Sequence, residues 1–318
     1  MLRVLPPLVA TGVVAATAHR RRSTAQQPTF ALQREFTNTA VRDGAFTVAQ
    51  WNLLADGLSG RDPALGGFTH GLDARFLQWE YRQPLIAREL AASDADIVML
   101  EECDHPEDVR AALPGHHCIF QPKRHSPCLA NSPLPDGCLL AVRAARFEVE
   151  AHEAFFLREE DNQCCVTATL RDVRTGKRIV AAVTHLKAAK DAAGEAVRTA
   201  QARHVAQRVE RAMADGGAPH AVLGCDLNAT PTSKAYALLL RRGFRSSFAQ
   251  CMGAEPAFTT CKQRSAGAKA SVIDYLFAVN LDADAVLRVP AGEPAPLPTA
   301  EHPSDHLLLV ARYSYPAQ

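Results

Sequence analysis

The stretch from which the fold can be argued is Gly-Cys-Asp-Leu-Asn-Ala-Thr-Pro, residues 224–231. Together with the apolar residues before it, this stretch predicts a buried strand, Ala221–Cys225, that ends at Asp226. Carboxylates are rarely buried without a partner, so Asp226 and Asn228 need an explanation. They are either turn or cap residues, which is the common case, or parts of a site at the edge of a sheet.

Polar side chains stand at or just beyond an apolar run in five other places. These are Asn52, Glu101 with Glu102, His185, Asp274, and Asp305 with His306. One such residue is usually a turn residue, but six placements of types suited to hard cations and phosphate favour a shared site. Hydrolysis of a phosphate ester needs a hard cation, a base for the attacking water, and donors for the developing charge. This set of side chains offers all three.

Strands and helices are mixed along the whole chain around this site. The mixture favours an α/β or α+β sandwich in which helices cover the sheets. We expect a folded domain at residues 45–318 after a leader and linker at 1–44. Strands are predicted at 48–54, 97–100, 138–142, 179–185, 221–225, 272–278 and 307–311, with helices at 78–93, 195–214 and 233–241.

The composition is that of an ordinary soluble protein, with 47% apolar and 22% charged residues among 318. A net charge of +1 gives no global signal for nucleic acid or membrane binding. The nine cysteines are odd in number and contain no C-x-x-C pair, which disfavours a zinc site or a disulfide framework. The scattered cysteines favour a reducing compartment. We also expect a monomer without a membrane span.

The N-terminal thirty residues carry arginines and small residues but no acidic residue before Glu35. Their apolar run, Leu5–Ala18, is shorter than the roughly 20 residues that span a bilayer. This composition resembles an organelle transit peptide and predicts a mitochondrial protein, with a cytoplasmic one as the alternative. A secretory signal and a terminus of chance composition are the rival interpretations. The thiol usage favours the transit peptide over secretion.

Read in order, these motifs resemble those of the endonuclease/exonuclease/phosphatase superfamily. The motifs are W-N (51–52), L-E-E (100–102), T-H-L-K (184–187), G-C-D-L-N-A-T-P (224–231), I-D-Y (273–275) and S-D-H (304–306). The resemblance covers residues 48–312. It implies a four-layer α/β sandwich, in which two packed mixed β-sheets are flanked by helices and the site lies at one end.

Further stretches are similar to the nocturnin family, which is grouped with the carbon-catabolite-repression deadenylases. They are F-Q-P-K-R-H-S-P-C-L (120–129), P-D-G-C (135–138), T-H-L-K-A (184–188), F-T-T-C-K (258–262) and P-S-D-H-L (303–307). This resemblance implies removal of the 2′-phosphate of NADP⁺ or NADPH to give NAD⁺ or NADH and phosphate. The alternative is a 3′ exoribonuclease that shortens poly(A) on mRNA. Aromatics of only 6% and the low net charge favour the small substrate over an RNA track.

The resemblance also implies a role for each site residue. Mg²⁺, with Mn²⁺ as a substitute, would be bound by Glu102, Asn52 and Asp305. Asp226 would orient and deprotonate the water, with Asn228 fixing the water or the phosphate. His306, held by Asp274, and His185 would donate to the phosphate. The residues expected to hold the substrate are Lys123, Lys187, Lys190, Asn228 and His185.

Two interpretations stay open for several of these residues. His185 could be a satisfied core histidine, and Lys123 and Lys187 could be solvated surface lysines. The chain also departs from the family pattern at three positions. Glu101 replaces a glutamine, Cys225 replaces a glycine before the aspartate, and Ala189, followed by Lys190, replaces an arginine that helps to hold substrate. Arg198 and Gln201 match a family helix motif that supports the site from behind.

Overall fold

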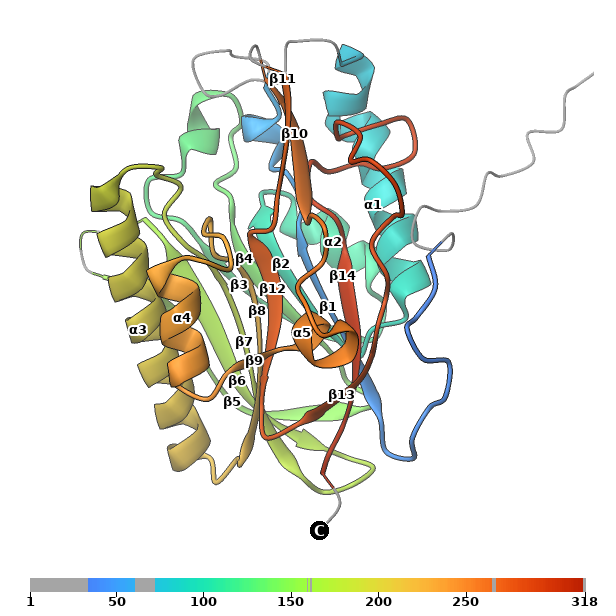
Figure 1. The fold of residues 1–318 in the computed structure, drawn as a ribbon, viewed down its shortest axis with the longest axis vertical. Coiled ribbons are helices and arrows are strands. Elements are labelled where there is room, and N and C mark those ends of the chain that lie inside the picture. Colours follow the sequence, from blue (N-terminus) through green and yellow to red (C-terminus); the bar gives the residue numbers. More distant parts are fainter. Residues whose placement is uncertain (1–33, 61–71, 159, 161, 265–266, 317–318) are drawn as a thin grey trace, which may run out of the picture.

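The computed structural model describes residues 34–60, 72–158, 160, 162–264 and 267–316. Two six-stranded sheets pack face to face, and helices cover their outer faces (Figure 1). This confirms the four-layer sandwich. The first sheet has the order β13 (Asp282–Val286), β14 (Leu309–Ser314), β1 (Phe46–Asn52), β2 (Ile97–Cys103), β4 (Gly137–Arg143) and β3 (His116–Pro122).

The second sheet is built from the middle of the chain. Its order is β5 (Phe147–Phe156), β6 (Cys164–Asp172), β7 (Arg178–His185), β8 (His220–Asp226), β12 (Asp274–Val279) and β9 (Arg245–Ser246). A separate hairpin of β10 (Thr260–Arg264) and β11 (Gly267–Ser271) stands at the top of the sandwich (Figure 1). In the first sheet, the last strand, β14, lies between β13 and β1 and runs antiparallel to both.

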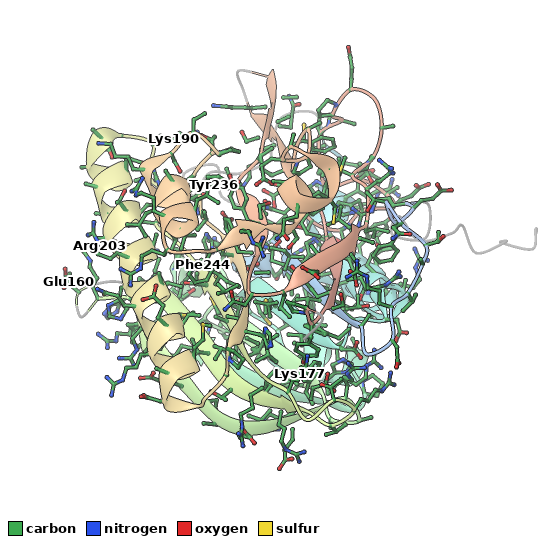
Figure 2. The ribbon with its side chains drawn as sticks, turned by 60° about the horizontal axis from the view of Figure 1, so that its bottom comes forward. Glu160, Lys177, Lys190, Arg203, Tyr236 and Phe244 are labelled. Carbon is green, nitrogen blue, oxygen red and sulfur yellow. The ribbon has the colours of Figure 1, made fainter. Side chains whose placement is uncertain are left out.

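Helices cover each sheet on its outer side. The first sheet is covered by α1 (Trp79–Ser93) and α2 (Pro106–Ala112), and the second by α3 (Ala192–Asp215) and α4 (Lys234–Arg241). Tyr236 and Phe244 pack between α4 and the second sheet, whereas Arg203 on α3 points away from it (Figure 2). A fifth short helix, α5 (Ser247–Met252), follows β9, and single turns of 3₁₀ helix lie at Asp56–Leu58, Ala74–Leu77 and Pro127–Ala130.

The main core lies between the two sheets and follows from the alternation of side chains along each strand. On β1, Val48 points into this core, whereas Ala49 and Trp51 point outward and pack beneath α1. The sheets approach closely at Gly224 of β8. A β-carbon there would lie 2.6 Å from the Sδ atom of Met99 on β2, so only glycine fits without displacing that side chain.

The first described residues already belong to the fold. The Thr37 N–H donates to the Val286 carbonyl at 2.9 Å, and the Arg288 N–H donates to the Glu35 carbonyl at 2.9 Å. Part of the stretch expected as linker, residues 1–44, therefore pairs with the edge of the first sheet. The leader expected before it lies outside the described residues. Within those residues, no helix is both long and apolar enough to cross a membrane.

Candidate active site

The polar residues predicted from the strand ends meet at one end of the sandwich, between the two sheets. Parallel pairing of β7 with β8 places His185 beside Asp226, and antiparallel pairing of β12 with β8 places Asp274 on the other side of Asp226. Asn52 at the end of β1 donates through Nδ2 to the Asp226 Oδ2 atom at 3.0 Å, which joins the first sheet to the second. The sheet register therefore brings these four side chains together.

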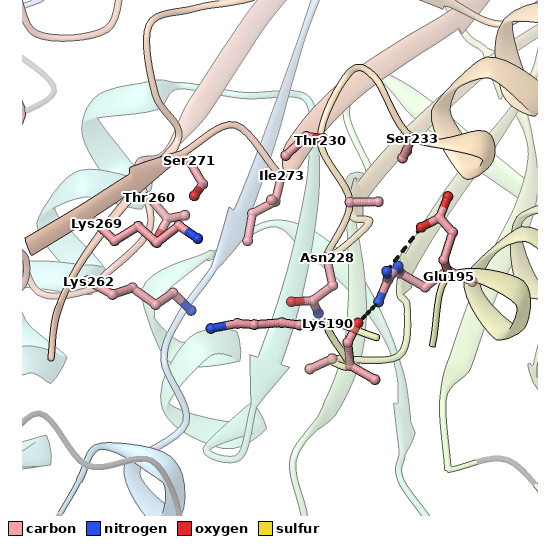
Figure 3. A pocket seen from close by; sticks show the side chains of 14 residues that line it. Lys190, Glu195, Asn228, Thr230, Ser233, Thr260, Lys262, Lys269, Ser271 and Ile273 are labelled. Atoms are coloured by element: carbon pink, nitrogen blue, oxygen red, sulfur yellow. Dashed lines mark hydrogen bonds and ion pairs between the residues drawn. The ribbon is translucent and has the colours of Figure 1, made fainter. Parts of the chain in front are cut away.

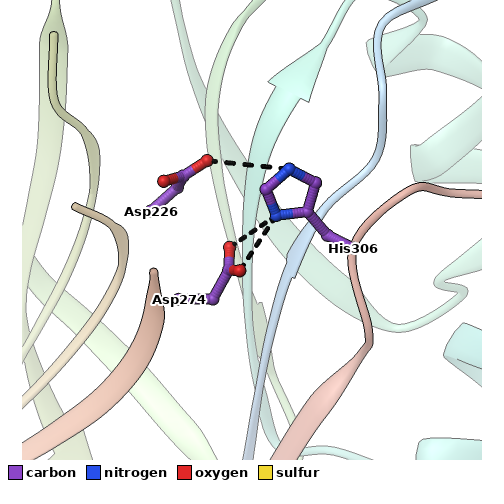
Figure 4. Close-up of side chains that lie close together, drawn as sticks. All are labelled: Asp226, Asp274 and His306. Atoms are coloured by element: carbon purple, nitrogen blue, oxygen red, sulfur yellow. Dashed lines mark hydrogen bonds and ion pairs between the residues drawn. The ribbon is translucent and has the colours of Figure 1, made fainter. Parts of the chain in front are cut away.

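A buried cluster of two carboxylates and one imidazole lies at the centre of this end (Figure 4). The Nδ1 atom of His306 lies 2.9 Å from both oxygens of Asp274, whose Oδ2 also accepts from the Thr259 hydroxyl at 2.6 Å. The Nε2 atom of His306 lies 3.9 Å from Asp226 Oδ2. His306 therefore stands between the two carboxylates with one ring nitrogen bound and the other facing Asp226.

His306 is held as an imidazolium. Burial alone would lower its pKa, but the Asp274 carboxylate, helped by Asp305, raises the pKa to about 9. Its Nε2 atom is buried and has no hydrogen-bond partner within the described part of the chain. A protonated imidazole cannot bind a metal, although one ligand atom each from His306, Asp226 and Asp274 lies within 4.8 Å of the others. The cluster is better suited to donating to an oxyanion.

Asp226 has the surroundings of a base. Burial, and then the neighbouring Asp274 carboxylate, raise the pKa of Asp226 above its ordinary value. Its Oδ1 atom accepts the Asn228 backbone N–H at 2.8 Å, and its Oδ2 atom accepts from Asn52. A raised pKa makes a carboxylate a stronger proton acceptor, and these two donors fix its orientation.

Glu102 offers a carboxylate that suits a hard cation. The residue lies near the end of β2 with a φ of 52°, where the pairing of β2 with β4 is irregular between Leu100 and Cys103. Its oxygens accept from Asn52 Nδ2 at 3.1 Å and from the Ala55 N–H at 3.3 Å. Among the described residues, no lysine or arginine lies within ion-pair distance of it. A half-buried carboxylate with neutral donors only fits Mg²⁺ or Mn²⁺.

The other two expected metal ligands have different partners. Asn52 presents its amide nitrogen to the carboxylates of Glu102 and Asp226, and its oxygen accepts the Leu54 N–H at 3.0 Å. Asp305 forms an ion pair with Lys262 through its Oδ2 atom, at 2.9 Å. Asn52 is thus placed to position Glu102, and Asp305 already has a cationic partner.

The family departures at Glu101 and Cys225 leave the site intact. Glu101 points between the sheets, where its Oε2 atom accepts from Gln50 Nε2 at 2.8 Å. Burial, with added repulsion from Asp274 and Asp226, raises the pKa of Glu101 well above its ordinary value. Cys225 points the other way, into the core beneath α4, and lies within β8 rather than in a turn.

His185 differs from the donor expected for it. The Nδ2 atom of Asn228 donates to the Leu186 carbonyl at 3.0 Å and lies 2.8 Å from the Nε2 atom of His185, which therefore accepts. Burial lowers the pKa of His185 to about 4, so its ring is neutral. The geometry makes His185 a residue that positions Asn228, rather than a second Nε2 donor to phosphate.

The three lysines expected to hold substrate lie in different surroundings. Lys123 is buried and forms an ion pair with Asp136, which also accepts from Ser126. Lys187 is exposed and does not line the pocket described next. Lys190, in the loop between β7 and α3, does line it. The structure thus brings Lys190 to the site directly but leaves the side chain of Lys187 in solvent.

A pocket of about 480 Å³ lies next to the buried cluster, between the loop that carries Lys190 and the β10–β11 hairpin. Figure 3 shows the ammonium groups of Lys190, Lys262 and Lys269 directed into it. Asn228 lines the same pocket, and Thr260 forms a bridge to His306. Its volume is within the range of small-molecule sites.

The residues that form the fold and this site match a known protein family. The model of the endonuclease/exonuclease/phosphatase family matches residues 49–306. The chain belongs to the endonuclease/exonuclease/phosphatase family. Nocturnin from Xenopus laevis is 31% identical over 305 residues, covering 90% of this chain and 76% of that protein. The chain therefore belongs to the nocturnin group within the family.

Two further comparisons are with a solved structure and with a carbon catabolite repressor protein. The structure of the human nocturnin catalytic domain with bound sulfate has a TM-score of 0.71 and 28% identity, covering 91% of this chain and 100% of that domain. Carbon catabolite repressor protein 4 homolog 1 of Arabidopsis thaliana is 29% identical over 36% of this chain and 19% of its own length. Enzymes of this family are hydrolases of the phosphatase or nuclease type that generally depend on a divalent metal.

The family helix motif supports the pocket loop as expected. Arg198 of α3 donates through Nη1 to the carbonyls of Lys187, at 3.1 Å, and of Ala189. The Lys187 N–H in turn donates to Gln201 Oε1 at 3.0 Å. These bonds fix the loop that carries Lys190.

Sequence reasoning missed the hairpin side of this family site. Lys262, Lys269, Thr260 and Ser271 all line the pocket from β10 and β11, and Thr259 holds Asp274. The motif F-T-T-C-K (258–262) contains Thr259, Thr260 and Lys262 and is a signal for them, whereas Lys269 and Ser271 lie outside it.

Proposed function

We propose that this protein is a metal-dependent phosphomonoesterase that removes the 2′-phosphate from NADP⁺ and NADPH. The observation that carries the proposal is the buried imidazolium of His306 facing the basic carboxylate of Asp226, beside a lysine-lined pocket. The nocturnin relatives, and the fact that the human nocturnin catalytic domain was solved with a bound sulfate anion, support a phosphate-binding function. The metal-dependent hydrolase class is the family's; the NADP(H) substrate is our proposal.

Each residue has a defined part in the proposed reaction. His306 Nε2 donates to a non-bridging phosphate oxygen, and Asp274 keeps the proton on its ring. Asp226 accepts a proton from the attacking water, while Asn52 and the Asn228 N–H hold its two oxygens in place. A preorganised donor of this kind is worth about 10²–10³ in kcat.

Glu102 is the proposed metal ligand, positioned by Asn52 and the Ala55 N–H, with Asp305 close by. When bound there, Mg²⁺ or Mn²⁺ would neutralise negative charge on the phosphate oxygens. Lys123 and Lys190 add positive charge around the substrate, and Asn228 lines the pocket beside His185. Lys123 lies close enough to Glu102 for that carboxylate, after Asp136, to raise its pKa against the effect of burial.

The decisive experiment compares two substrates with one pure sample in Mg²⁺. Phosphate release from NADPH should be fast, whereas shortening of a fluorescent oligo(A) should be slow. His306→Gln keeps a hydrogen-bond donor of similar size but not the positive charge. This variant should release phosphate at least about 10²-fold more slowly than the wild type. Rapid trimming of oligo(A) without phosphate release from NADPH would overturn the proposed substrate and favour the 3′ exoribonuclease.

We further propose that the protein acts as a monomer in mitochondria, where the arginine-bearing leader would direct it. The basis for the proposed location is the composition of residues 1–30, which carry no acidic residue.

A further inference from the structure

A fully buried arginine on α1 contacts the loop that follows β1. The side chain of Arg82 is 0% exposed, and its guanidinium donates to main-chain carbonyls. Its Nη1 atom lies 2.7 Å from the Leu54 oxygen and 3.0 Å from the Leu53 oxygen, and its Nε atom donates to Leu77 at 3.3 Å. The carboxylate of Asp56 lies 3.9 Å from Nη2, which is beyond hydrogen-bond distance. This arginine therefore binds backbone rather than an acidic partner.

Stability alone does not explain an arginine at this position. Burying a charge costs free energy, and an apolar side chain of similar volume is often as stable or more stable. The Nη2 atom of Arg82 is buried without a hydrogen-bond partner in the part of the chain that the structure describes. A methionine there could pack against Trp79, over whose ring the guanidinium already lies, 5.5 Å from the centroid. The carbonyls that Arg82 holds therefore indicate what it does.

The backbone turn at Leu54 is strained, and Arg82 holds one side of it. Leu54 has a φ of 57°, in the left-handed region, which costs a residue other than glycine about 1–2 kcal/mol. Its N–H donates to Asn52 Oδ1 at 3.0 Å, and its carbonyl accepts from Arg82. The turn brings the next N–H, that of Ala55, to the carboxylate of Glu102 at 3.3 Å. Strained backbone of this kind persists only where the surrounding contacts hold it.

The same guanidinium reaches the segment that carries the proposed phosphate donor. The Nη1 atom of Arg82 lies 3.4 Å from the Pro303 oxygen. The next residue, Ser304, donates through Oγ to the Asn52 carbonyl at 2.6 Å and accepts the His306 N–H at 3.1 Å. One buried side chain therefore contacts both the loop after β1 and the backbone that leads to His306.

We propose that Arg82 is a positioning residue for the reaction. Arg82 and the carbonyls of Leu54 and Pro303 form a clamp, which holds the backbone beside Glu102 and the backbone before His306 in one arrangement. The metal ligand and the phosphate donor then keep a fixed separation. A misplacement of about 1 Å can slow a reaction about 10²-fold, so a rigid clamp matters for the rate. This inference rests on the roles of Glu102 and His306 in the proposed function, and the test separates the clamp from those roles.

Two variants of the clamp and one control make the test. Arg82→Lys keeps the charge but replaces the planar fork with a single ammonium, and Arg82→Met removes the charge as well. Arg146→Met is the matched control, because Arg146 is also buried and donates to the Gly44 carbonyl at 2.7 Å and to Asp172 at 2.8 Å. Gly44 precedes β1, whereas the site lies where β1 ends, so this control is far from the reaction. Each full-length variant is assayed for kcat and KM with NADPH in Mg²⁺, and for amide hydrogen exchange in EDTA.

Loss of the clamp should lower kcat about 10²-fold in Arg82→Met and about tenfold in Arg82→Lys, with KM changed less than about twofold. The reason is that misaligned reacting groups weaken the transition state and not the bound substrate. Amide exchange in residues 53–58 and 304–306 should become at least about tenfold faster in Arg82→Met, and the rest of the first sheet should change less. Arg146→Met should lower the thermal midpoint without either effect.

Wild-type exchange rates in both segments of Arg82→Met would overturn the clamp. A uniform rise in exchange across the first sheet, or an equal loss of kcat in Arg146→Met, would show that Arg82 only stabilises the fold. If Arg82→Met does not fold, Arg82→Lys decides by the same two measurements. If the wild type releases no phosphate from NADPH, the proposed function fails, and the exchange rates still decide whether Arg82 holds the turn.

Discussion

Replacing Asp274 with asparagine removes the charge that keeps His306 protonated, while leaving a hydrogen-bond acceptor beside its Nδ1 atom. The pKa of His306 is raised from 6.5 to about 9 although burial opposes this. This difference in pKa corresponds to about 3 kcal/mol by which the folded protein stabilises the protonated form of His306. In Asp274→Asn, the pKa should fall to 6.5 or below.

The consequence for activity depends on pH. At pH 8, a histidine with a pKa of about 9 is about 90% protonated, whereas one with a pKa of 6.5 is about 3% protonated. If the imidazolium is the active form, Asp274→Asn should lower kcat/KM about 30-fold at pH 8. The ratio of variant to wild type should recover as the pH falls toward 6, because His306 regains its proton in the variant.

The loss of stability in Asp274→Asn should depend on pH in the opposite way, because it should be larger at low pH. A raised folded-state pKa contributes stability that is fully present below the unfolded pKa of 6.5 and is lost as the pH rises through about 9. The wild type should therefore exceed the variant in unfolding free energy by about 3 kcal/mol at pH 6, and by much less at pH 9.5.

Two measurements check this pair of trends: kcat/KM for NADPH from pH 5.5 to 9.5, and urea unfolding over the same range. Greater activity loss at the pH where the stability loss is smaller would show that His306 acts as a charged donor. An activity loss of the same size at pH 6 and pH 8 would refute the reasoning, because Asp274 would then only hold the fold together.

Three further predictions follow from the fold, the metal site and the leader. Glu102→Ala should lower kcat at least about 10²-fold without changing the thermal midpoint, and EDTA should abolish wild-type turnover; full activity in EDTA would contradict the metal assignment. Gly224→Ala should cost about 1–3 kcal/mol in urea unfolding because its β-carbon meets Met99, and adding Met99→Ala should recover part of that loss; full stability of the single variant would contradict the close approach. Residues 1–30 fused to a fluorescent reporter should direct it to mitochondria, and a secreted or cytosolic reporter would rule that out.

The parts of the fold that were predictable are those whose pattern is set by the core. The helix predicted at 78–93 is α1, Trp79–Ser93, and the strand predicted to end at Asp226 is β8, His220–Asp226. In the helix, apolar residues recur at the helical period because one face is buried. The strand is a continuous apolar run because both of its faces are buried. The strand ends were informative for the same reason, since a polar residue there breaks an otherwise apolar run.

The parts that were missed have no such pattern. The β10–β11 hairpin stands outside the sheets, and residues 267–270 are all exposed, so hydrophobic alternation could not reveal it. Without the hairpin, Lys262 and Lys269 could not be placed. Asn52 and Asp305 were assigned from the family resemblance, but the orientation of an amide and the pairing of a carboxylate with a lysine depend on neighbours distant in sequence.

The position of β14 between β13 and β1 has a consequence for protein synthesis. All strands of the second sheet come from one continuous stretch of the chain. In the first sheet, β1 pairs with β14, whose residues are made more than 250 positions later. His306 and Asp305 lie just before that strand. A chain whose synthesis stops before residue 304 would contain every strand of the second sheet. It would leave one edge of β1 unpaired and would lack His306. The proposed phosphate donor is therefore among the last residues of the domain to be made.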